Sequence, residues 1–224
     1  IVYFTYVGFF RHENYYSLRL DLGNMSQTVW NVMSGHGFTL TDPMSENQMS
    51  RLAAHADFLL IVIAPLYRLW TDPKLLILIQ AIVLGIGAIP LFWIAKRKTG
   101  SRVVALVLSV SYLLYPPLHR SMLYDFHAVT LATTFLLFAY WAMEEKRFVL
   151  FIVFALLSAS TKEQVWLQIA LMGGAIALRK ETRWLGVSVA LASIGAFYYL
   201  LWHVIPSATI SGQHFAMSYF SEFG

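Results

Sequence analysis

The residues best suited to chemistry lie at three separate places in the chain. Asp21 precedes a stretch with helical spacing, so one carboxylate oxygen could cap that helix while the other accepts a substrate proton. Asp125 and His127 lie two residues apart, between a Pro-Pro pair and an apolar run. A carboxylate and an imidazole at that spacing could form an acid/base or metal-binding pair, or could simply cap a helix. Lys162-Glu163 separates two apolar stretches and is the third place.

A charged pair between apolar stretches is costly at membrane depth, and it therefore indicates a function. The Lys162 ammonium group could hold a phosphate as a compact point charge. The alternative is that Lys162 and Glu163 neutralise each other at a turn.

Further polar residues lie near the ends of apolar runs. Arg51 and Arg120 could bind a lipid phosphate, although interfacial arginines also act as simple anchors. His55 precedes a short apolar stretch and could hydrogen-bond a ligand. We predict catalytic roles for Asp21 and Asp125, and substrate-binding roles for Lys162, Glu163, His55, His127, Arg51 and Arg120.

The composition predicts that these residues are carried by a membrane protein. The chain has 224 residues, of which 58% are hydrophobic and 12% are charged. Soluble domains are roughly 25% charged, so a water-soluble surface cannot be built from this sequence. The absence of cysteine excludes disulfides and thiolate metal sites. The basic residues lie in short loops between apolar runs, which is a membrane pattern and argues against nucleic acid as a partner.

Apolar runs alternate with polar breaks and predict an all-α, polytopic transmembrane bundle in one domain, residues 1–224. The run 1–10 is short and predicts the tail of a truncated first helix. The stretch 58–70 would cover about 20 Å, less than the ~30 Å hydrocarbon core, so we expect it to enter the outer leaflet and return. The predicted membrane helices are 74–95, 103–117, 128–143, 148–160, 165–178 and 184–205, with outer loops at 11–73 and 206–224.

Residues 148–178 allow two interpretations. One helix over the whole range would be about 46 Å long and would need a strong tilt. We favour two helices that meet at a turn around Lys162, which keeps the later topology consistent.

The outer loop 11–73 is expected to carry interfacial helices. Apolar residues recur at helical spacing from Leu22 to Met33, with Asp21 at the N-cap position and Gly35 at the C′ position. Ser45-Glu46-Asn47-Gln48 has the pattern of a capping box and predicts a second short helix. Asp72-Pro73 is typical of the start of the next membrane helix.

The basic loops predict the orientation. Residues 96–102, 144–147 and 179–183 hold nine of the sixteen Lys and Arg residues, which assigns these loops to the cytoplasm. The candidate site residues and all seven histidines then face the other side. We therefore expect a prokaryotic plasma (inner) membrane protein whose site faces the extracytoplasmic side.

Five motifs, taken in order, resemble the DUF2079 family of membrane proteins and, more broadly, the GT-C superfamily of membrane glycosyltransferases. They are Asp21-Leu22-Gly23-Asn24-Met25-Ser26-Gln27 with Trp30-Asn31, then His55, Pro65-Leu66-Tyr67, Tyr124-Asp125-Phe126-His127 and Lys162-Glu163. The resemblance covers almost the whole chain.

This resemblance implies an enzyme that moves a sugar from a polyprenyl-phosphate carrier to an acceptor on the extracytoplasmic face. Asp21 matches the aspartate that acts as base or orients the acceptor, Asp125 matches a later outer-loop aspartate, and Lys162 matches a lysine near the carrier phosphate. A divalent metal ion is the cofactor implied. Many GT-C members have an acidic pair in the first loop, whereas Leu22 follows Asp21 here, which weakens the case for metal binding by this loop.

Two other functions compete with transfer. An intramembrane Lys162-Glu163 pair also fits a transporter or flippase for a lipid-linked or anionic substrate, although no inverted repeat is visible. A non-catalytic membrane protein would scatter its polar residues as caps and anchors. Convergence of Asp21, His55, Asp125 and Lys162 on one cavity would favour the enzyme.

Overall fold

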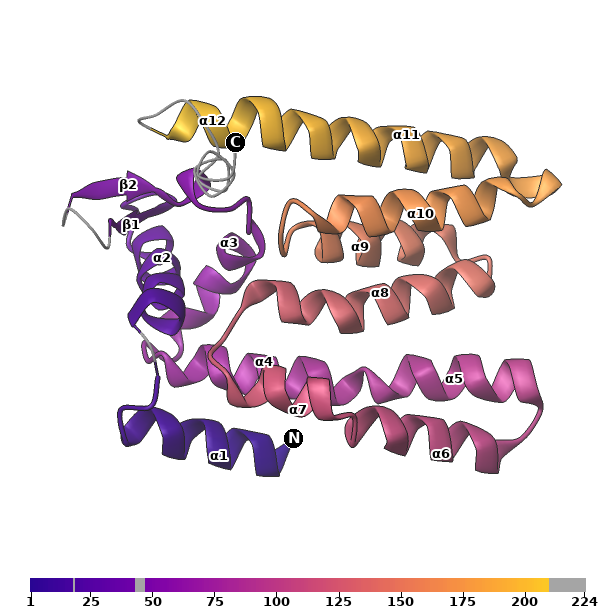
Figure 1. Cartoon of the computed structure of the whole chain (residues 1–224), viewed down its shortest axis with the longest axis horizontal. Helices are drawn as coiled ribbons and strands as arrows, with labels where there is room; N and C mark the ends of the chain where they lie inside the picture. The colour runs from indigo at the N-terminus through magenta and orange to yellow at the C-terminus, as the bar shows by residue number, and fades with distance from the viewer. Residues whose placement is uncertain (18, 43–46, 210–224) are drawn as a thin grey trace, which may run out of the picture. The chain divides into compact units, whose positions relative to one another are not determined.

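The computed structural model describes residues 1–17, 19–42 and 47–209, and nearly all of its regular structure is helical (Figure 1). The chain divides into two compact units. Unit 1 comprises Ile1–Ser26 and Leu66–Ser158, and unit 2 comprises Gln27–Pro65 and Ala159–Gly224. The prediction of a single domain stays a prediction.

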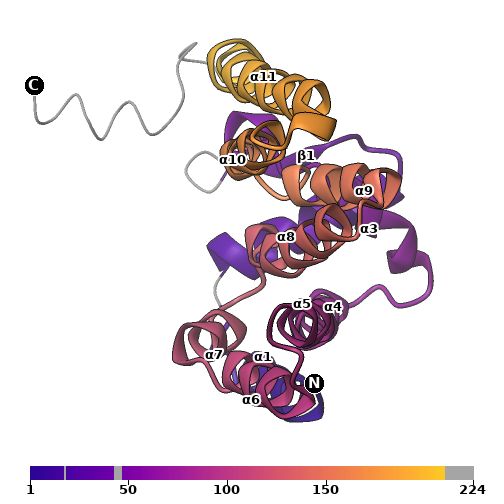
Figure 2. The same cartoon turned by 90° about the vertical axis from the view of Figure 1, so that its right-hand side faces the viewer.

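Unit 1 is a set of packed helices. It contains α1 (Val2–Glu13), a π-helical turn (Arg19–Gly23), α4 (Lys74–Ile86), α5 (Ala88–Thr99), α6 (Arg102–Leu113), α7 (Pro116–Leu123), α8 (Ala128–Glu144) and most of α9 (Phe148–Ala159). Helix α6 lies beside α5, and α4 contacts α1 and α8; Figure 2 shows these helices nearly end-on. Ala81 and Leu84 of α4 pack on Leu118 and Met122 of α7. This packing holds α7 against α4, and the predicted site residues Asp125 and His127 follow directly after α7.

Unit 2 contains shorter elements and one helical hairpin. Its elements are most of α2 (Asn24–Met33), β1 (Thr39–Thr41), β2 (Gln48–Ser50), a 3-10 turn (Arg51–Ala53), α3 (Leu59–Ile63), α10 (Val165–Ala177), a 3-10 turn (Lys180–Thr182), α11 (Arg183–Tyr199), a π-helical turn (Leu200–Val204) and α12 (Ile205–Ala208). A further 3-10 segment, Ala64–Arg68, crosses the boundary between the units. Strands β1 and β2 form an antiparallel pair.

Helices α10 and α11 pack with little space between their backbones. A Cβ atom added at Gly173 would lie 2.7 Å from the Ala190 nitrogen and 2.9 Å from the Gly186 oxygen. Small residues permit this close approach, which replaces the hydrophobic driving force that helices lack in lipid.

Among the described residues, three helices are long and apolar enough to cross a membrane: Lys74–Thr99, Arg102–Leu123 and Lys180–Ala208, with 26, 22 and 29 residues. The predicted segments near 128–143, 148–160 and 165–178 are also helical, but they are shorter. Residues 148–178 form two helices, α9 and α10, with a break between Ala159 and Val165, as the favoured interpretation required. Asp72 accepts a hydrogen bond from the Lys74 N–H at 2.8 Å, so it caps α4.

Several local expectations were wrong. Asp21 is not a helix N-cap, because it lies inside the π-helical turn that precedes α2. Helix α7, which begins at the Pro-Pro pair, was not predicted; prolines are well tolerated in the first turn of a helix. Gln48 begins strand β2 instead of a second interfacial helix, so the fold is mostly helical but not all-α. The Ser45 and Glu46 part of that predicted capping box lies outside the described residues.

Candidate functional site

The structure brings together two of the predicted site residues of unit 1. The Asp21 Oδ1 atom lies 3.2 Å from the His127 Nε2 atom, although the residues are 106 positions apart in sequence. Both side chains are about one quarter exposed, at 25% for Asp21 and 26% for His127. A ligand could therefore reach this pair from outside the unit.

The second ring nitrogen of His127, Nδ1, also has a hydrogen-bond partner. Nδ1 lies 3.1 Å from the Asp125 backbone oxygen. A carbonyl oxygen only accepts hydrogen bonds, so Nδ1 carries a proton and donates it. The Nε2–Oδ1 contact also needs one proton, which is held either by His127 as imidazolium or by Asp21 as carboxylic acid. The pair thus joins a carboxylate and an imidazole through one hydrogen bond.

A buried glutamine of α4 positions His127. The Gln80 side-chain oxygen accepts hydrogen bonds from the His127 N–H at 3.0 Å and from the Thr130 hydroxyl at 2.9 Å. The Gln80 amide nitrogen donates to the Ser121 carbonyl at 3.2 Å. Gln80 is 1% exposed, so these bonds join the end of α7, the start of α8 and α4 through one side chain.

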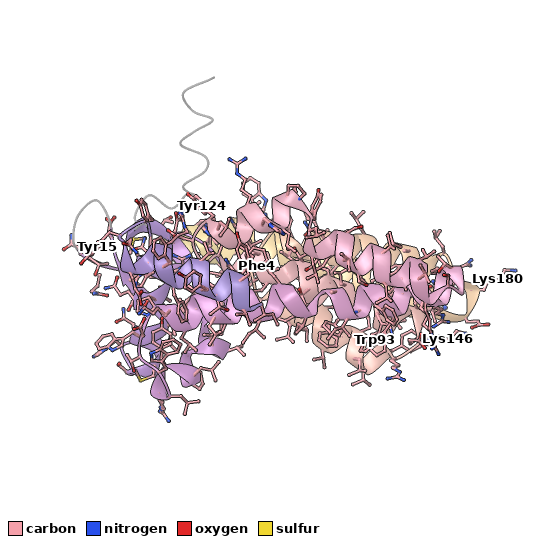
Figure 3. All side chains as sticks on the ribbon, turned by 90° about the horizontal axis from the view of Figure 1, so that it is seen from below. Phe4, Tyr15, Trp93, Tyr124, Lys146 and Lys180 are labelled. Atoms are coloured by element: carbon pink, nitrogen blue, oxygen red, sulfur yellow. The ribbon has the colours of Figure 1, made fainter. Side chains whose placement is uncertain are left out.

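Tyr124 completes the group that we call the Asp21 cluster: Asp21, Tyr124 and His127. The negative charge of Asp21, followed by partial burial, a hydrogen bond to Asp21 and the charge of Asp125, raises the pKa of the Tyr124 hydroxyl. The Tyr124 and His127 ring centres are 5.4 Å apart. Figure 3 labels Tyr124 among the side chains of unit 1. A raised pKa keeps the hydroxyl protonated, so Tyr124 serves as a hydrogen-bond donor to Asp21.

Asp125 has a different environment from Asp21. It is 5% exposed and lines a narrow pocket together with Arg11, Ser17, Gln80 and Tyr124, among others. This pocket has a volume of about 10 Å³ for the centres of water molecules, which corresponds to about one water. A sugar does not fit there, so a substrate would have to lie over the exposed side of Asp21. A catalytic role for Asp125 stays a prediction.

Unit 2 holds a second polar group around Glu163, in the turn between α9 and α10. The His55 Nδ1 atom lies 3.0 Å from Glu163 Oε1, and the Ala56 N–H donates to Glu163 Oε2 at 3.0 Å. Burial alone would raise the pKa of the Glu163 carboxyl. The hydrogen bond and charge of His55, together with backbone N–H groups, outweigh burial and lower the pKa from 4.5 to about 2. Glu163 is therefore a fixed carboxylate.

Arg51 forms a buried ion pair with Asp57 in the same unit. The Arg51 Nε atom lies 3.0 and 3.1 Å from the two Asp57 carboxylate oxygens, and Nη2 lies 2.6 Å from Oδ2. Arg51 and Asp57 are 4% and 3% exposed. The Arg51 guanidinium is thus committed to Asp57, and its predicted role toward substrate is untested. We call Arg51, His55, Asp57 and Glu163 the Glu163 cluster.

The two remaining cations differ from Arg51. Lys162 is half-buried, and within residues 1–17, 19–42 and 47–209 its ammonium group forms no ion pair. The expected alternative, a self-neutralised Lys162–Glu163 pair, is not what the structure shows, because Glu163 pairs with His55. Arg120 is exposed on α7 in unit 1.

Several candidate residues thus come together within each unit, and convergence of Asp21, His55, Asp125 and Lys162 on one cavity stays a prediction. Across the described part of the chain, no three His, Cys, Asp or Glu side chains come together in a way that could hold a metal ion. Binding of the divalent cation that the resemblance implies stays a prediction, and no step below uses one.

Neither the contact of Gln80 with His127 nor the contact of Tyr124 with Asp21 was predicted from the sequence. A glutamine within an otherwise apolar span was the available signal for Gln80, because an unpaired amide is costly in a membrane.

Comparison with known proteins gives one match. The family described as "Predicted membrane protein (DUF2079)" matches residues 11–224. No curated protein matches the chain significantly, and neither does any solved structure.

Proposed function

The chain belongs to the DUF2079 family of predicted membrane proteins, and we propose that it is a membrane glycosyltransferase of the GT-C type. In this proposal it moves a sugar from a polyprenyl-phosphate carrier to an acceptor hydroxyl on the extracytoplasmic face. The observation that carries the proposal is the contact between Asp21 and His127: a carboxylate and an imidazole, each about one quarter exposed, in a chain with helices long and apolar enough to span a membrane. The sequence resemblance supplies the donor class.

Asp21 is the general base of the proposed reaction. Its carboxylate takes the proton of the acceptor hydroxyl while that oxygen forms a bond to the anomeric carbon. The bond from the anomeric carbon to the carrier phosphate breaks, its electron pair leaves with the phosphate, and the configuration inverts. A positioned base of this kind contributes about 10²- to 10⁴-fold in rate.

His127 and Tyr124 prepare Asp21 for this step. A protonated Nε2 on His127 donates to Oδ1, which leaves the other carboxylate oxygen to accept the new proton. Tyr124 donates a hydrogen bond to the same carboxylate, which orients it. Gln80 holds the His127 backbone, so the imidazole direction is set from within the helices.

Lys162 belongs to unit 2, and its role toward the carrier phosphate is what the sequence resemblance implies. Its ammonium group forms no ion pair in the described ranges, and the residue lies in the turn between the apolar helices α9 and α10. A cation that meets charge developing on a leaving group accelerates the chemical step. A Lys162→Gln variant should therefore slow transfer, while Asp21→Asn should slow it through the base.

The test is direct observation of transfer. Full-length protein in proteoliposomes is incubated with a panel of labelled polyprenyl-phosphate sugars and a membrane extract as the acceptor source. We expect loss of label from the carrier with the wild type, and about a 100-fold or larger decrease with Asp21→Asn. Glu13→Gln is the matched control, because Glu13 is an exposed carboxylate of unit 1 whose ion-pair partner is Lys74 and not a member of the cluster.

Two outcomes would overturn the proposal. Asp21→Asn with full transfer activity and normal folding would remove the base. Movement of intact labelled lipid across the bilayer, without loss of label, would identify a transporter instead.

A further inference from the structure

A second site lies at the end of unit 1 that carries the loops 96–102 and 144–147. An open groove of about 550 Å³ is lined by Trp93, Lys96, Arg97, Trp141 and Glu145. All five residues belong to unit 1, and the proposed glycosyl transfer uses none of them. Figure 3 labels Trp93 and Lys146 at this end of the unit.

The helix ends explain how the groove forms. Helix α5 ends at Thr99, and Gly100 follows in the left-handed conformation at φ +70°. Ser101 then caps α6 by accepting the Val104 N–H at 3.3 Å. The last turn of α5 therefore carries Lys96, Arg97 and Lys98 together, where the helix dipole favours positive charge.

Two tryptophans make the apolar wall of the groove. The ring centres of Trp93 and Trp141 are 4.8 Å apart, and the Arg147 guanidinium lies over Trp141 at 5.1 Å from the ring centre. Trp93 is 40% exposed. Tryptophan next to cations is typical of the membrane–water interface, where the ring lies among lipid headgroups.

The charge of this end is strongly positive. Residues 96–102 and 144–147 contain six basic and two acidic side chains. Both acids are engaged: Glu145 pairs with Arg97, and Glu144 pairs with Lys98. Lys96 is exposed and forms no ion pair within the part of the chain that the structure describes. The groove thus offers uncompensated positive charge beside an aromatic wall.

Lys96 also lies at the right depth for a headgroup. It is the twenty-third residue of the helix Lys74–Thr99, and 22 helical steps of about 1.5 Å cover about 33 Å, close to the ~30 Å of a hydrocarbon core. Basic pockets at the ends of membrane helices bind anionic headgroups. We propose that this groove binds the headgroup of an anionic phospholipid: its phosphate contacts Lys96 and Arg97, and its glycerol and upper acyl chain contact Trp93 and Trp141.

The test measures lipid binding to the full-length protein in neutral detergent by native mass spectrometry. Short-chain phosphatidylglycerol and phosphatidylcholine are titrated separately. We expect phosphatidylglycerol to bind more tightly than phosphatidylcholine, and Lys96→Gln to weaken phosphatidylglycerol binding about five-fold. Trp93→Leu should weaken it while leaving the charge unchanged.

Lys180→Gln is the matched control, because it removes one exposed cation from another basic loop. It should leave the tightest phosphatidylglycerol site unchanged. Equal effects of Lys96→Gln and Lys180→Gln would overturn the proposal, since general surface charge would then explain the binding. Equal affinity for the two lipids would also overturn it, as would displacement of the bound lipid by millimolar inorganic phosphate, which would make the groove a site for free phosphate.

Discussion

The Asp21 cluster and the Glu163 cluster each pair a carboxylate with a histidine, but the two carboxylates differ in their exposure. In unit 1 the Asp21–His127 pair is about one quarter exposed, and the Asp21 carboxylate faces a surface that a ligand can reach. In unit 2 Glu163 and Asp57 are nearly fully buried, and each carboxylate is bound by two hydrogen-bonding groups or by a bidentate arginine.

This difference separates reactive groups from structural ones. A carboxylate whose oxygens are all satisfied inside the protein stabilises the fold and has nothing left to offer a substrate. A carboxylate held by one imidazole and one phenol keeps accepting capacity on its exposed side. In our proposal, chemistry therefore belongs to the Asp21 cluster, whereas the buried contacts of the Glu163 cluster are expected to stabilise unit 2.

The largest effect is expected for the Asp21–His127 pair. Asp21→Asn and His127→Ala should each slow sugar transfer by about 10²- to 10⁴-fold. Residues that act as one unit are not additive, so the double variant should be no slower than the slower single variant. Initial transfer rates are measured for the wild type, the two single variants and the double variant, which together form a double-mutant cycle. Fully multiplicative losses would show that the two residues act independently.

The next effect concerns stability in unit 2. Asp57→Asn removes the charge opposite Arg51 and leaves a buried guanidinium uncompensated, which should lower the free energy of unfolding by about 3–5 kcal/mol. Replacing both partners, as in Arg51→Met with Asp57→Leu, should recover most of this loss. Thermal unfolding in detergent, followed by tryptophan fluorescence, measures both variants. A double variant as unstable as Asp57→Asn would contradict the assignment.

A smaller effect tests the helical hairpin that follows the Glu163 turn. Gly173→Ala places a Cβ atom against the backbone of α11, so we expect destabilisation of about 1–3 kcal/mol. The neighbouring Gly174 has no atom within 4 Å of an added Cβ, and Gly174→Ala should be neutral. The same unfolding assay compares them, and equal behaviour of the two variants would argue against close packing here.

The smallest effect is the pH dependence from Glu163. Its pKa is lowered from 4.5 to about 2 in the folded protein, so its contribution is complete above pH 4.5 and is lost as the pH falls toward 2. Between pH 5 and 3.5 the wild type should lose about 1 kcal/mol that a Glu163→Gln variant does not lose. The difference between their unfolding curves at the two pH values measures it, and parallel losses would show that Glu163 is not held as a carboxylate.

Hydropathy and residue type predicted most of the framework and several members of the two clusters. Apolar runs gave the helices near residues 74–95, 103–117 and 184–205, and the structure finds membrane-length helices at all three. Asp21, His127, His55 and Glu163 were chosen from residue type, but their pairing was not, because the partners are 106 and 108 residues apart.

Short sequence patterns did not predict the local conformation where one pattern fits two conformations. The spacing around Asp21 is helical in either case, so it could not distinguish an N-cap from a π-helical turn. Prolines that end one helix can begin the next, and the Pro-Pro pair forms the start of α7. Asp57 was visible two residues after His55, but its partner Arg51 lies across a turn that sequence spacing does not fix.

The most direct test of the account compares two amide substitutions in one assay. Sugar transfer per folded molecule and the unfolding temperature are measured together for Asp21→Asn and Asp57→Asn. We expect Asp21→Asn to unfold like the wild type but to transfer at about 1% of its rate or less, whereas Asp57→Asn should unfold at a lower temperature and keep its activity per folded molecule. Full activity in Asp21→Asn, with Asp57→Asn stable but inactive, would contradict it.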